Sequence, residues 1–375
     1  MFVKTQLKNI ASYSKGVQIN GDKLIDDGIY EYLNGGIVPS GKWNDFNTPG
    51  KTITISEGGN SCGYVNYMQK PFWCGAHCYY LFDTKINSEY LYYALKSQQD
   101  RLMGIRSGAC MPNIKKTDLG MFEIKYDTDE NKQEIVVKAL RNVEFIINSR
   151  LKELHQLDQL IKARFVEMFG DPASNNKGWL VAKLGEYITL LTDFSANGSY
   201  ELLDSNVVMY DEPNYALMVR TTDLENRDFS NNVKYIDENA YELLSKSKLY
   251  GGELIMNKIG SAGRIYLMPY LGKPASLGRN AFMFRFDERI NVNFLYMLLT
   301  TEYGTNEIQQ YVRGAVTKTI TKDSARLIRI IVPPISLQNE FENFVQQIDK
   351  SKVVVQKALD EAQTLFDSLM QEYFG

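Results

Sequence analysis

Two families of polar loops carry residue types that can read nucleic-acid bases. Such reading needs hydrogen-bond donors and acceptors on loops whose glycines allow close approach of the backbone. The first family contains Gly58, Gly59, Asn60 and Ser61, matched later in the chain by Lys258, Gly260, Ser261 and Arg264. The second contains Arg106, Ser107, Asn113, Lys115 and Lys116, matched by Arg313, Thr317, Lys318, Thr319, Thr321 and Lys322. Arg279 and Asn280 add a guanine-type reader beside an adenine-type reader. Each residue alone reads as an ordinary solvated loop residue, but their recurrence at equivalent places predicts DNA contacts.

The charge distribution separates two stretches of the chain. The net charge of −3 argues against a simple polycationic nucleic-acid binder. Lys and Arg number 6 against 13 Asp and Glu over residues 179–253, and 11 against 5 over residues 254–335. The second stretch is a candidate phosphate-facing surface, because neutralising phosphates supplies most of the non-specific affinity for DNA. A solvated charged face is the alternative.

The loops recur because the chain repeats once. Residues 165–170 read Phe-Val-Glu-Met-Phe-Gly and residues 370–375 read Met-Gln-Glu-Tyr-Phe-Gly, at an offset of 205. Residues 86–92 match residues 290–296, and the offset drifts from 200 to 206 along the chain, as short insertions require. A duplication is the simplest explanation.

Each repeat is predicted to end in a long helix. Apolar residues recur every three or four positions over residues 127–170 and 336–375, with no glycine or proline before the closing Phe-Gly. Each helix would be roughly 55 Å long, and helices of that length usually pair. Opposite net charges favour pairing with each other, and the alternative is that each packs only on its own domain. The predicted pairing and partner-docking residues are Leu140, Val143, Ile147, Leu154, Ile161, Phe165, Val345, Ile348, Leu359, Phe366 and Leu369.

The remaining residues predict two globular domains of the α+β class. Runs such as residues 51–55, 281–286 and 327–332 read as strands between turns rich in glycine and asparagine, and one helix is expected in each domain, near 88–101 and 291–302. The predicted fold is a tandem pseudo-repeat of two α+β domains separated by two long antiparallel coiled-coil helices. Its parts are a domain at 1–126, a helix at 127–170, a linker at 171–178, a domain at 179–335 and a helix at 336–375.

No residue pattern supports catalysis. The sequence has no Gly-rich loop ending in Gly-Lys-Ser/Thr, no Asn-Pro-Pro-Tyr signature of amino-methyltransferases and no nuclease-type pairing of Asp with Glu-x-Lys. His155 is expected to be a surface or seam residue. No apolar segment suits a signal peptide or a membrane span, so we expect a cytoplasmic protein.

The four cysteines are expected to be free thiols, because they are sparse and all fall in the first third of the chain. Cys74, His77 and Cys78, with Cys62 nearby, lack the second ligand pair of a closed zinc site and read as part of a buried strand. The fourth cysteine is Cys110. No metal site is expected.

Three sequence motifs in the repeats resemble those of a known protein family. They are Phe-Val-Glu-Met-Phe-Gly-Asp-Pro from Phe165, Pro-Pro-Ile-Ser-Leu-Gln-Asn-Glu-Phe from Pro333 and Lys-Leu-Gly-Glu from Lys183. With the tandem repeat, they make the whole chain resemble the specificity subunits of type I restriction-modification systems. The first repeat departs from the pattern, since Tyr126-Asp127 replaces the Pro-Pro and blurs the junction between domain and helix.

The resemblance implies a non-catalytic subunit that recognises a bipartite DNA site. Each domain would be a target-recognition domain for one half-site, and the paired helices would set the gap between the half-sites. The implied partners are double-stranded DNA, two methylation (modification) subunits that carry S-adenosylmethionine, and two restriction (motor-nuclease) subunits that use ATP and Mg. No cofactor is expected in this chain.

Two other functions fit the sequence. The DNA-recognition subunit of a type II methyltransferase-nuclease shares this architecture. A coiled-coil protein-interaction adaptor is favoured by the near-zero net charge. The adaptor predicts binding that is insensitive to salt, whereas DNA binding weakens steeply with salt.

Overall fold

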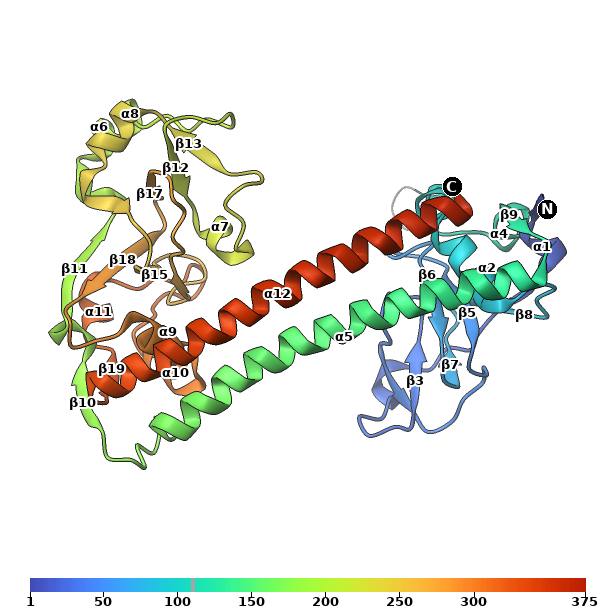
Figure 1. Cartoon of the computed structure of the whole chain (residues 1–375), viewed down its shortest axis with the longest axis horizontal. Helices are drawn as coiled ribbons and strands as arrows, with labels where there is room; N and C mark the ends of the chain where they lie inside the picture. Colours follow the sequence, from blue (N-terminus) through green and yellow to red (C-terminus); the bar gives the residue numbers. More distant parts are fainter. Residues whose placement is uncertain (109–111) are drawn as a thin grey trace. The chain divides into compact units, whose positions relative to one another are not determined.

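The computed structural model describes residues 1–108 and 112–375, which form two compact units (Figure 1). Unit 1 comprises Met1–Leu154 with Val354–Gly375, and unit 2 comprises His155–Val353. The two long helices are α5, Glu130–Phe169, and α12, Ile335–Phe374. Each long helix therefore contributes one of its ends to each unit. The predicted α+β class with two long helices is confirmed.

Helix α5 begins a few residues later than the prediction of 127. Asp127 belongs to a strand, and Asp129 precedes the helix. The Asp129 carboxylate accepts hydrogen bonds from the backbone N–H groups of Asn131 at 3.0 Å and Lys132 at 3.3 Å. This side chain satisfies donors of the first turn that no backbone carbonyl can reach, so it fixes the start of the helix.

Unit 1 contains three β-sheets. Strand β1 pairs antiparallel with β9, a four-stranded antiparallel sheet has the order β2-β8-β5-β6, and a third sheet has the order β4-β3-β7 with β3 and β7 parallel. The strands are β1 Phe2–Gln6, β2 Ser12–Lys15, β3 Tyr30–Leu33, β4 Gly41–Trp43, β5 Thr52–Ser56, β6 Val65–Met68, β7 Phe72–Cys74, β8 Cys78–Phe82 and β9 Glu123–Asp127.

Unit 2 repeats this topology strand for strand. Strand β10 pairs with β19, the four-stranded sheet has the order β11-β18-β15-β16, and the third sheet has the order β13-β12-β17-β14, in which β14 is an addition. The predicted duplication is thus present in the strand order as well as in the residues. The strands are β10 Leu180–Lys183, β11 Ile188–Asp193, β12 Ala216–Val219, β13 Lys234–Ile236, β14 Lys248–Leu249, β15 Leu254–Asn257, β16 Ile265–Leu267, β17 Ala275–Leu277, β18 Ala281–Phe286 and β19 Arg329–Val332.

Both domains hold more helix than the sequence pattern predicts. The helix expected near 88–101 ends at Lys96, and α3 follows as a separate helix. The helix expected near 291–302 ends at Thr300, because Thr301 accepts from the N–H of Gly304 and caps the next helix. The domain helices are α1 Leu7–Ile10, α2 Ser88–Lys96, α3 Gln99–Gly104, α4 Lys116–Met121, α6 Tyr200–Asn206, α7 Thr221–Asn226, α8 Glu238–Leu243, α9 Val292–Thr300, α10 Glu302–Gln309 and α11 Lys322–Arg326.

The repeated Phe-Gly ends of the two long helices pack on equivalent helices of the domains, α2 in unit 1 and α9 in unit 2. In unit 2 the Phe169 ring, at the end of α5, lies 4.6 Å from the Phe294 ring of α9. In unit 1 the Phe374 ring, at the end of α12, lies 5.1 Å from the Tyr90 ring of α2. Edge and tilted aromatic contacts of this kind add to the burial energy of both rings. Each domain is therefore held by the start of one long helix and the end of the other.

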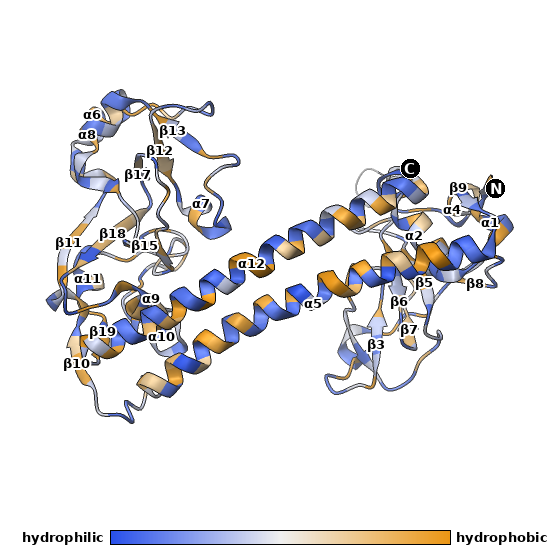
Figure 2. Cartoon of the chain, viewed as in Figure 1, coloured by the Kyte–Doolittle hydropathy of each residue, from blue (hydrophilic) through white to orange (hydrophobic). Residues whose placement is uncertain are grey.

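The long helices run antiparallel within unit 2, and hydrophobic residues recur along both of them (Figure 2). Arg164 of α5 pairs with Glu340 of α12 at 3.0 Å, and Asp158 pairs with Lys352 further along, so residue numbers rise in one helix as they fall in the other. Within the described residues, no helix is long and apolar enough to cross a membrane.

A buried glutamine joins each domain to a long helix in the same way. Gln338 accepts from the N–H of Asn291 at 2.8 Å and donates to the carbonyl of Pro333 at 2.8 Å. Gln133 makes the matching bonds to Asn87 at 3.0 Å and Asp127 at 2.7 Å. Asn87 and Asn291 in turn cap α2 and α9. One side chain thus fixes the helix cap, the end of the last strand and the long helix together.

Replacing this glutamine should destabilise the protein. In Gln338→Leu, two buried backbone groups lose their partners, so we expect the free energy of unfolding to fall by about 2–4 kcal/mol. Urea denaturation of the full chain measures the change. Gln346→Leu is the matched control, since Gln346 is exposed on the same helix, and it should change stability by less than about 0.5 kcal/mol. Equal effects of the two substitutions would contradict the role assigned to Gln338.

Candidate nucleic-acid interface

The two predicted loop families lie side by side in unit 2. The turn at 258–264 follows β15, and a hairpin at 313–319 follows α10. The Gly260 N–H donates to the Lys318 carbonyl at 3.0 Å, and the Ile320 N–H donates to the Lys258 carbonyl at 3.0 Å. The hairpin is closed by two bonds between the backbones of Arg313 and Thr319, at 2.9 and 2.7 Å. The turn and the hairpin therefore form one anchored surface.

Unit 1 builds the same surface with matching backbone bonds. The Gly59 N–H donates to the Pro112 carbonyl at 3.0 Å, and the Ile114 N–H donates to the Glu57 carbonyl at 2.8 Å. Ser107 and Asn113 exchange two backbone bonds, at 2.8 and 2.9 Å. These bonds make Glu57 the structural equivalent of Lys258. We call the two surfaces the paired loops of unit 1 (residues 57–63 with 107, 108, 112 and 113) and of unit 2 (residues 258–264 with 313–319).

Each hairpin depends on one glycine. Gly108 and Gly314 both have a φ of 103°, a region that other residues rarely adopt. A Cβ on Gly314 would lie 2.1 Å from the Thr317 carbonyl oxygen. The hairpin at 313–319 therefore turns only with glycine at this position.

The Asp193 carboxylate of unit 2 forms ion pairs with two of the lysines that the sequence predicts to contact DNA. Asp193, at the end of β11, accepts from the Lys258 ammonium at 2.9 Å and the Lys322 ammonium at 2.8 Å, and both ammonium groups lie 5.8 Å from the centre of the Phe282 ring. Burial raises the pKa of Asp193, but the hydrogen bonds and charges of Lys322 and Lys258 outweigh it and hold the pKa below its usual value. We call Asp193, Lys258 and Lys322 the charged hub of unit 2.

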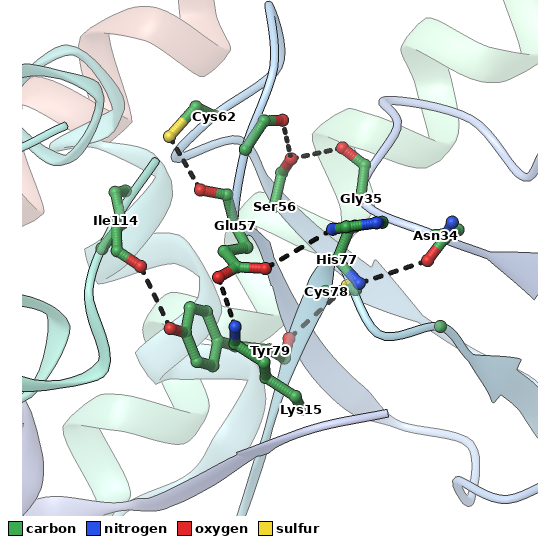
Figure 3. A network of polar contacts seen from close by, with 12 residues as sticks. Lys15, Asn34, Gly35, Ser56, Glu57, Cys62, His77, Cys78, Tyr79 and Ile114 are labelled. Atoms are coloured by element: carbon green, nitrogen blue, oxygen red, sulfur yellow. Dashed lines mark hydrogen bonds and ion pairs between the residues drawn. The ribbon is translucent and has the colours of Figure 1, made fainter. Parts of the chain in front are cut away.

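The equivalent ion pair of unit 1 has the opposite polarity (Figure 3). Lys15 lies opposite Tyr79 in its sheet as Asp193 lies opposite Phe282, so Lys15 occupies the position of Asp193. It pairs with Glu57, which occupies the position of Lys258. The Glu57 carboxylate also lies 3.6 Å from Nδ1 of His77. The site kept an ion pair after duplication and exchanged its signs, and the Lys15 end of the unit 1 pair is exposed.

Tyr79 closes the unit 1 network. Its hydroxyl donates to the Ile114 carbonyl at 3.0 Å, one residue from the hairpin (Figure 3). Burial, followed by the nearby charge of Glu57, raises the pKa of Tyr79 to about 12, so the hydroxyl keeps its proton and donates at neutral pH.

Several cations predicted to contact DNA are engaged within unit 2. Arg264 pairs with Glu225 at 3.2 Å, and Arg279 pairs with Asp204 at 3.3 Å. Arg313 donates from one guanidinium nitrogen to the Gln310 carbonyl at 2.6 Å. Arg285, Arg289 and Arg329 also pair with carboxylates. The stretch at 254–335 is thus much less cationic in the fold than its count of 11 against 5 implies.

The other predicted contacts divide by exposure. The half-buried ones are Ser61, which donates to the Gly35 carbonyl at 2.6 Å, and Thr319. The exposed ones are Gly59, Asn60, Arg106, Ser107, Asn113, Lys115, Lys116, Ser261, Asn280, Thr317, Lys318 and Thr321. These residues remain predicted DNA contacts. Sequence reasoning missed Lys15, Glu57 and Asp193, although a closer alignment would have set Glu57 against Lys258.

A groove of about 2090 Å³ adjoins the paired loops of unit 2. Its lining includes Ser261 and Lys318 of the loops, Lys162 of α5 and Tyr296 of α9. Six carboxylates and five cations line it, so it has no net positive field. The carboxylates are Asp158, Glu225, Glu288, Glu302, Glu342 and Asp349, and the cations are Lys162, Arg227, Arg264, Lys318 and Lys352.

The cysteines and histidines do not gather into a ligand set among the described residues. Cys62, Cys74 and Cys78 are buried free thiols, and His77 lies in the turn between β7 and β8. The predicted buried strand at 74–78 is thus two strands joined by a turn. His155 is exposed on α5 and contacts Gln159 at 2.8 Å. The expectation for Cys110 lies outside the described residues.

The predicted helix-pairing residues are all buried or half-buried. In unit 1, Leu140 joins the domain core, with Phe366 and Leu369 packed against it. In unit 2, Ile161 and Phe165 are core residues, with Val345 and Ile348 packed against them. The remaining members, Val143, Ile147, Leu154 and Leu359, fall between these two groups along the helices. The long helices therefore contact the domains and not only each other.

Comparison with known proteins finds one family. Residues 2–157 match the model of the type I restriction modification DNA specificity domain. A candidate type I specificity subunit of Mycoplasma genitalium is 33% identical over 162 residues, which cover 42% of this chain and 41% of that relative's length. The specificity subunit of the type I restriction enzyme MjaIX of Methanocaldococcus jannaschii is 23% identical over 327 residues, which cover 82% of this chain and 70% of that protein.

The fold also matches a solved structure. The crystal structure of the S subunit of a type I restriction-modification system from M. genitalium superposes with a TM-score of 0.66 at 21% identity, over 100% of this chain and 96% of that one. At this identity the likeness shows the shared fold, with both domains and both long helices included.

Proposed function

We propose that this chain, whose residues 2–157 match the model of the type I restriction modification DNA specificity domain, is the DNA-recognition subunit of a type I restriction-modification complex. The observation that carries the proposal is the presence of the paired loops in both units, built by the same backbone bonds. A bipartite DNA site needs two readers of one design with different side chains. The type II and adaptor functions are not favoured, because the relatives are type I specificity subunits.

Each unit would read one half-site through its paired loops. The exposed amide, hydroxyl and ammonium groups would face the DNA, and the ion pair beneath them would hold the loops in place. Two readers on one frame multiply their selectivity only when the gap between half-sites fits the frame. The subunit would act in the cytoplasm, where the DNA and its partners are.

The partners would supply the chemistry. Two methylation subunits would carry S-adenosylmethionine, two restriction subunits would use ATP and Mg, and this chain would be non-catalytic. The mixed charge of the unit 2 groove supports a protein occupant rather than DNA backbone. We expect the methylation subunits to use the part of this groove that α5, α9 and α12 line, together with the exposed faces of the long helices, and we leave Ser261 and Lys318 to the DNA.

The experiment is methylation of a random DNA library by the chain reconstituted with the methylation subunits encoded beside it. We expect one bipartite sequence to be methylated, and we expect binding to weaken by about a thousandfold between 50 and 200 mM salt. Absence of methylation on every sequence would overturn the proposal. Binding insensitive to salt would support the adaptor instead.

A further inference from the structure

The tip of the unit 2 hairpin exposes a single apolar side chain. Val316 is 99% exposed, the highest value of any large apolar residue in the described part of the chain. Isolated apolar residues on a surface need no explanation by themselves. Val316 differs because of the element that presents it.

The hairpin that presents Val316 is anchored at its base. Its two arms are tied at the base by the Arg313–Thr319 bonds, and the Gly260–Lys318 bond joins it to the neighbouring turn. The Arg313 guanidinium, bound to the Gln310 carbonyl, fixes the hairpin to the end of α10. Gly314 adopts the φ of 103° that the turn needs and that other residues rarely adopt. Anchoring of its base lowers the cost of ordering the hairpin on binding.

The hairpin is also suited to approach DNA. The hairpin itself, residues 313–319, has two cations, Arg313 and Lys318, and no carboxylate. Thr317 and Lys318, beside the tip, are exposed. The hairpin is a single chain reversal closed by one pair of backbone bonds, and it is narrow enough to enter the DNA major groove, which is about 12 Å wide.

We propose that the hairpin at 313–319 enters the major groove and that Val316 reads the C5 methyl group of a thymine in the half-site of unit 2. The inference rests on the proposed function. An apolar side chain cannot pair with the donors and acceptors of the base edges, and the thymine methyl is the one apolar group that the major groove offers. Lys318 and Thr317 would hold the hairpin on the flanking phosphates.

Thymine and uracil differ only in this methyl group, which makes the test direct. The bipartite site is first defined by methylation of the library. Each thymine is then replaced in turn by uracil in both half-sites, and binding by the full complex is measured. We expect one position, in one half-site, at which uracil weakens binding about fourfold, the effect of one lost methyl contact.

The variant Val316→Ser should weaken binding to thymine DNA to a similar extent and should be indifferent to uracil at that position. The two losses are then not additive, as a direct contact requires. Val316→Thr, which keeps one methyl, should retain part of the uracil effect. Lys318→Gln is the matched control, and it should weaken binding to thymine and uracil DNA by the same factor.

The outcomes separate this inference from the proposed function. If the complex methylates a bipartite site but no uracil position depends on residue 316, the assignment of Val316 is wrong and the function stands. A Val316→Ser loss that is equal on thymine and uracil DNA would also overturn the assignment. Failure to select any sequence would overturn the function itself. Because Val316 is fully exposed, its variants should unfold at the same temperature as the original chain, which a thermal melt verifies.

Discussion

Lengthening both long helices by seven residues should widen the gap in the recognised DNA sequence by about three base pairs and leave the half-sites unchanged. Seven residues add about 10 Å to a helix, and successive base pairs are about 3.4 Å apart. The insertions belong after Leu151 in α5 and after Ala358 in α12. Seven residues keep the repeat of 3.5 on which the apolar seam of paired helices depends.

The insertion points lie between the segments that contact the domains. On α5 the domain cores include Val136, Val137 and Leu140 in unit 1, and Ile161 and Phe165 in unit 2. On α12 the core contacts of unit 2 end at Ile348, and those of unit 1 begin at Phe366. Lengthening the intervening stretches should therefore change the distance between the readers without disturbing either reader.

Sequencing of the methylated library reports both the gap and the half-sites. The control is a variant with seven residues inserted into the exposed turn at 230–232. This insertion lengthens the chain but neither long helix, so the gap in the recognised sequence should stay the same. Insertion into α5 alone should put the helix seam out of register and lower stability. A gap that is unchanged after insertion into both helices would refute the idea that the helices set the spacing.

The long helices and the duplication were predictable from sequence because their signals are local. Apolar spacing of three and four over 40 residues fixes a helix whatever it packs against. The capping Asn87 and Asn291 are likewise visible within a few residues of the helices that they cap. Helix ends were less certain, since Ser97 and Thr301 break helices that the pattern would have continued.

The charged hub was not predictable because it depends on strand register. Asp193 reaches Lys258 only because β11 and β15 both pair with β18, in registers that set Asp193 and Met256 opposite Phe282. The sequence predicts that Lys258 and Lys322 contact DNA, because it gives no sign of their shared partner Asp193. The contact between the two loop families was also invisible, because residues 260 and 318 are far apart in the chain and are joined by a backbone bond.

The reversed polarity of the hub leads to the second large effect. Asp193→Lys should lower the free energy of unfolding by about 3–5 kcal/mol, since it replaces a buried partner of two lysines by a third positive charge. The double variant Asp193→Lys with Lys258→Glu should recover most of that loss. Unit 1 already carries this arrangement, with Lys15, Glu57 and Lys116 at the three equivalent positions. Urea denaturation of the single and double variants measures the recovery.

The hub should also contribute to acid sensitivity. The lysines hold the folded-state pKa of Asp193 below its unfolded value of about 3.9, so the stabilisation is fully present above that pH and is lost as the pH falls through the folded pKa. Asp193→Asn lacks this ionisation. The difference in unfolding free energy between the original chain and Asp193→Asn should therefore be constant near neutrality and should shrink below about pH 4.

The double variant tests whether the two sites are truly equivalent. A carboxylate at 258 must reach a lysine at 193 as Glu57 reaches Lys15, over an aromatic ring that is Phe282 in one unit and Tyr79 in the other. If recovery is complete, the ion pair stabilises the loops whichever residue carries the negative charge. DNA selectivity should then survive, because the exposed loop side chains are unchanged. If the double variant is as unstable as Asp193→Lys, the surroundings of each pair, such as His77 beside Glu57, fix its polarity, and the equivalence fails.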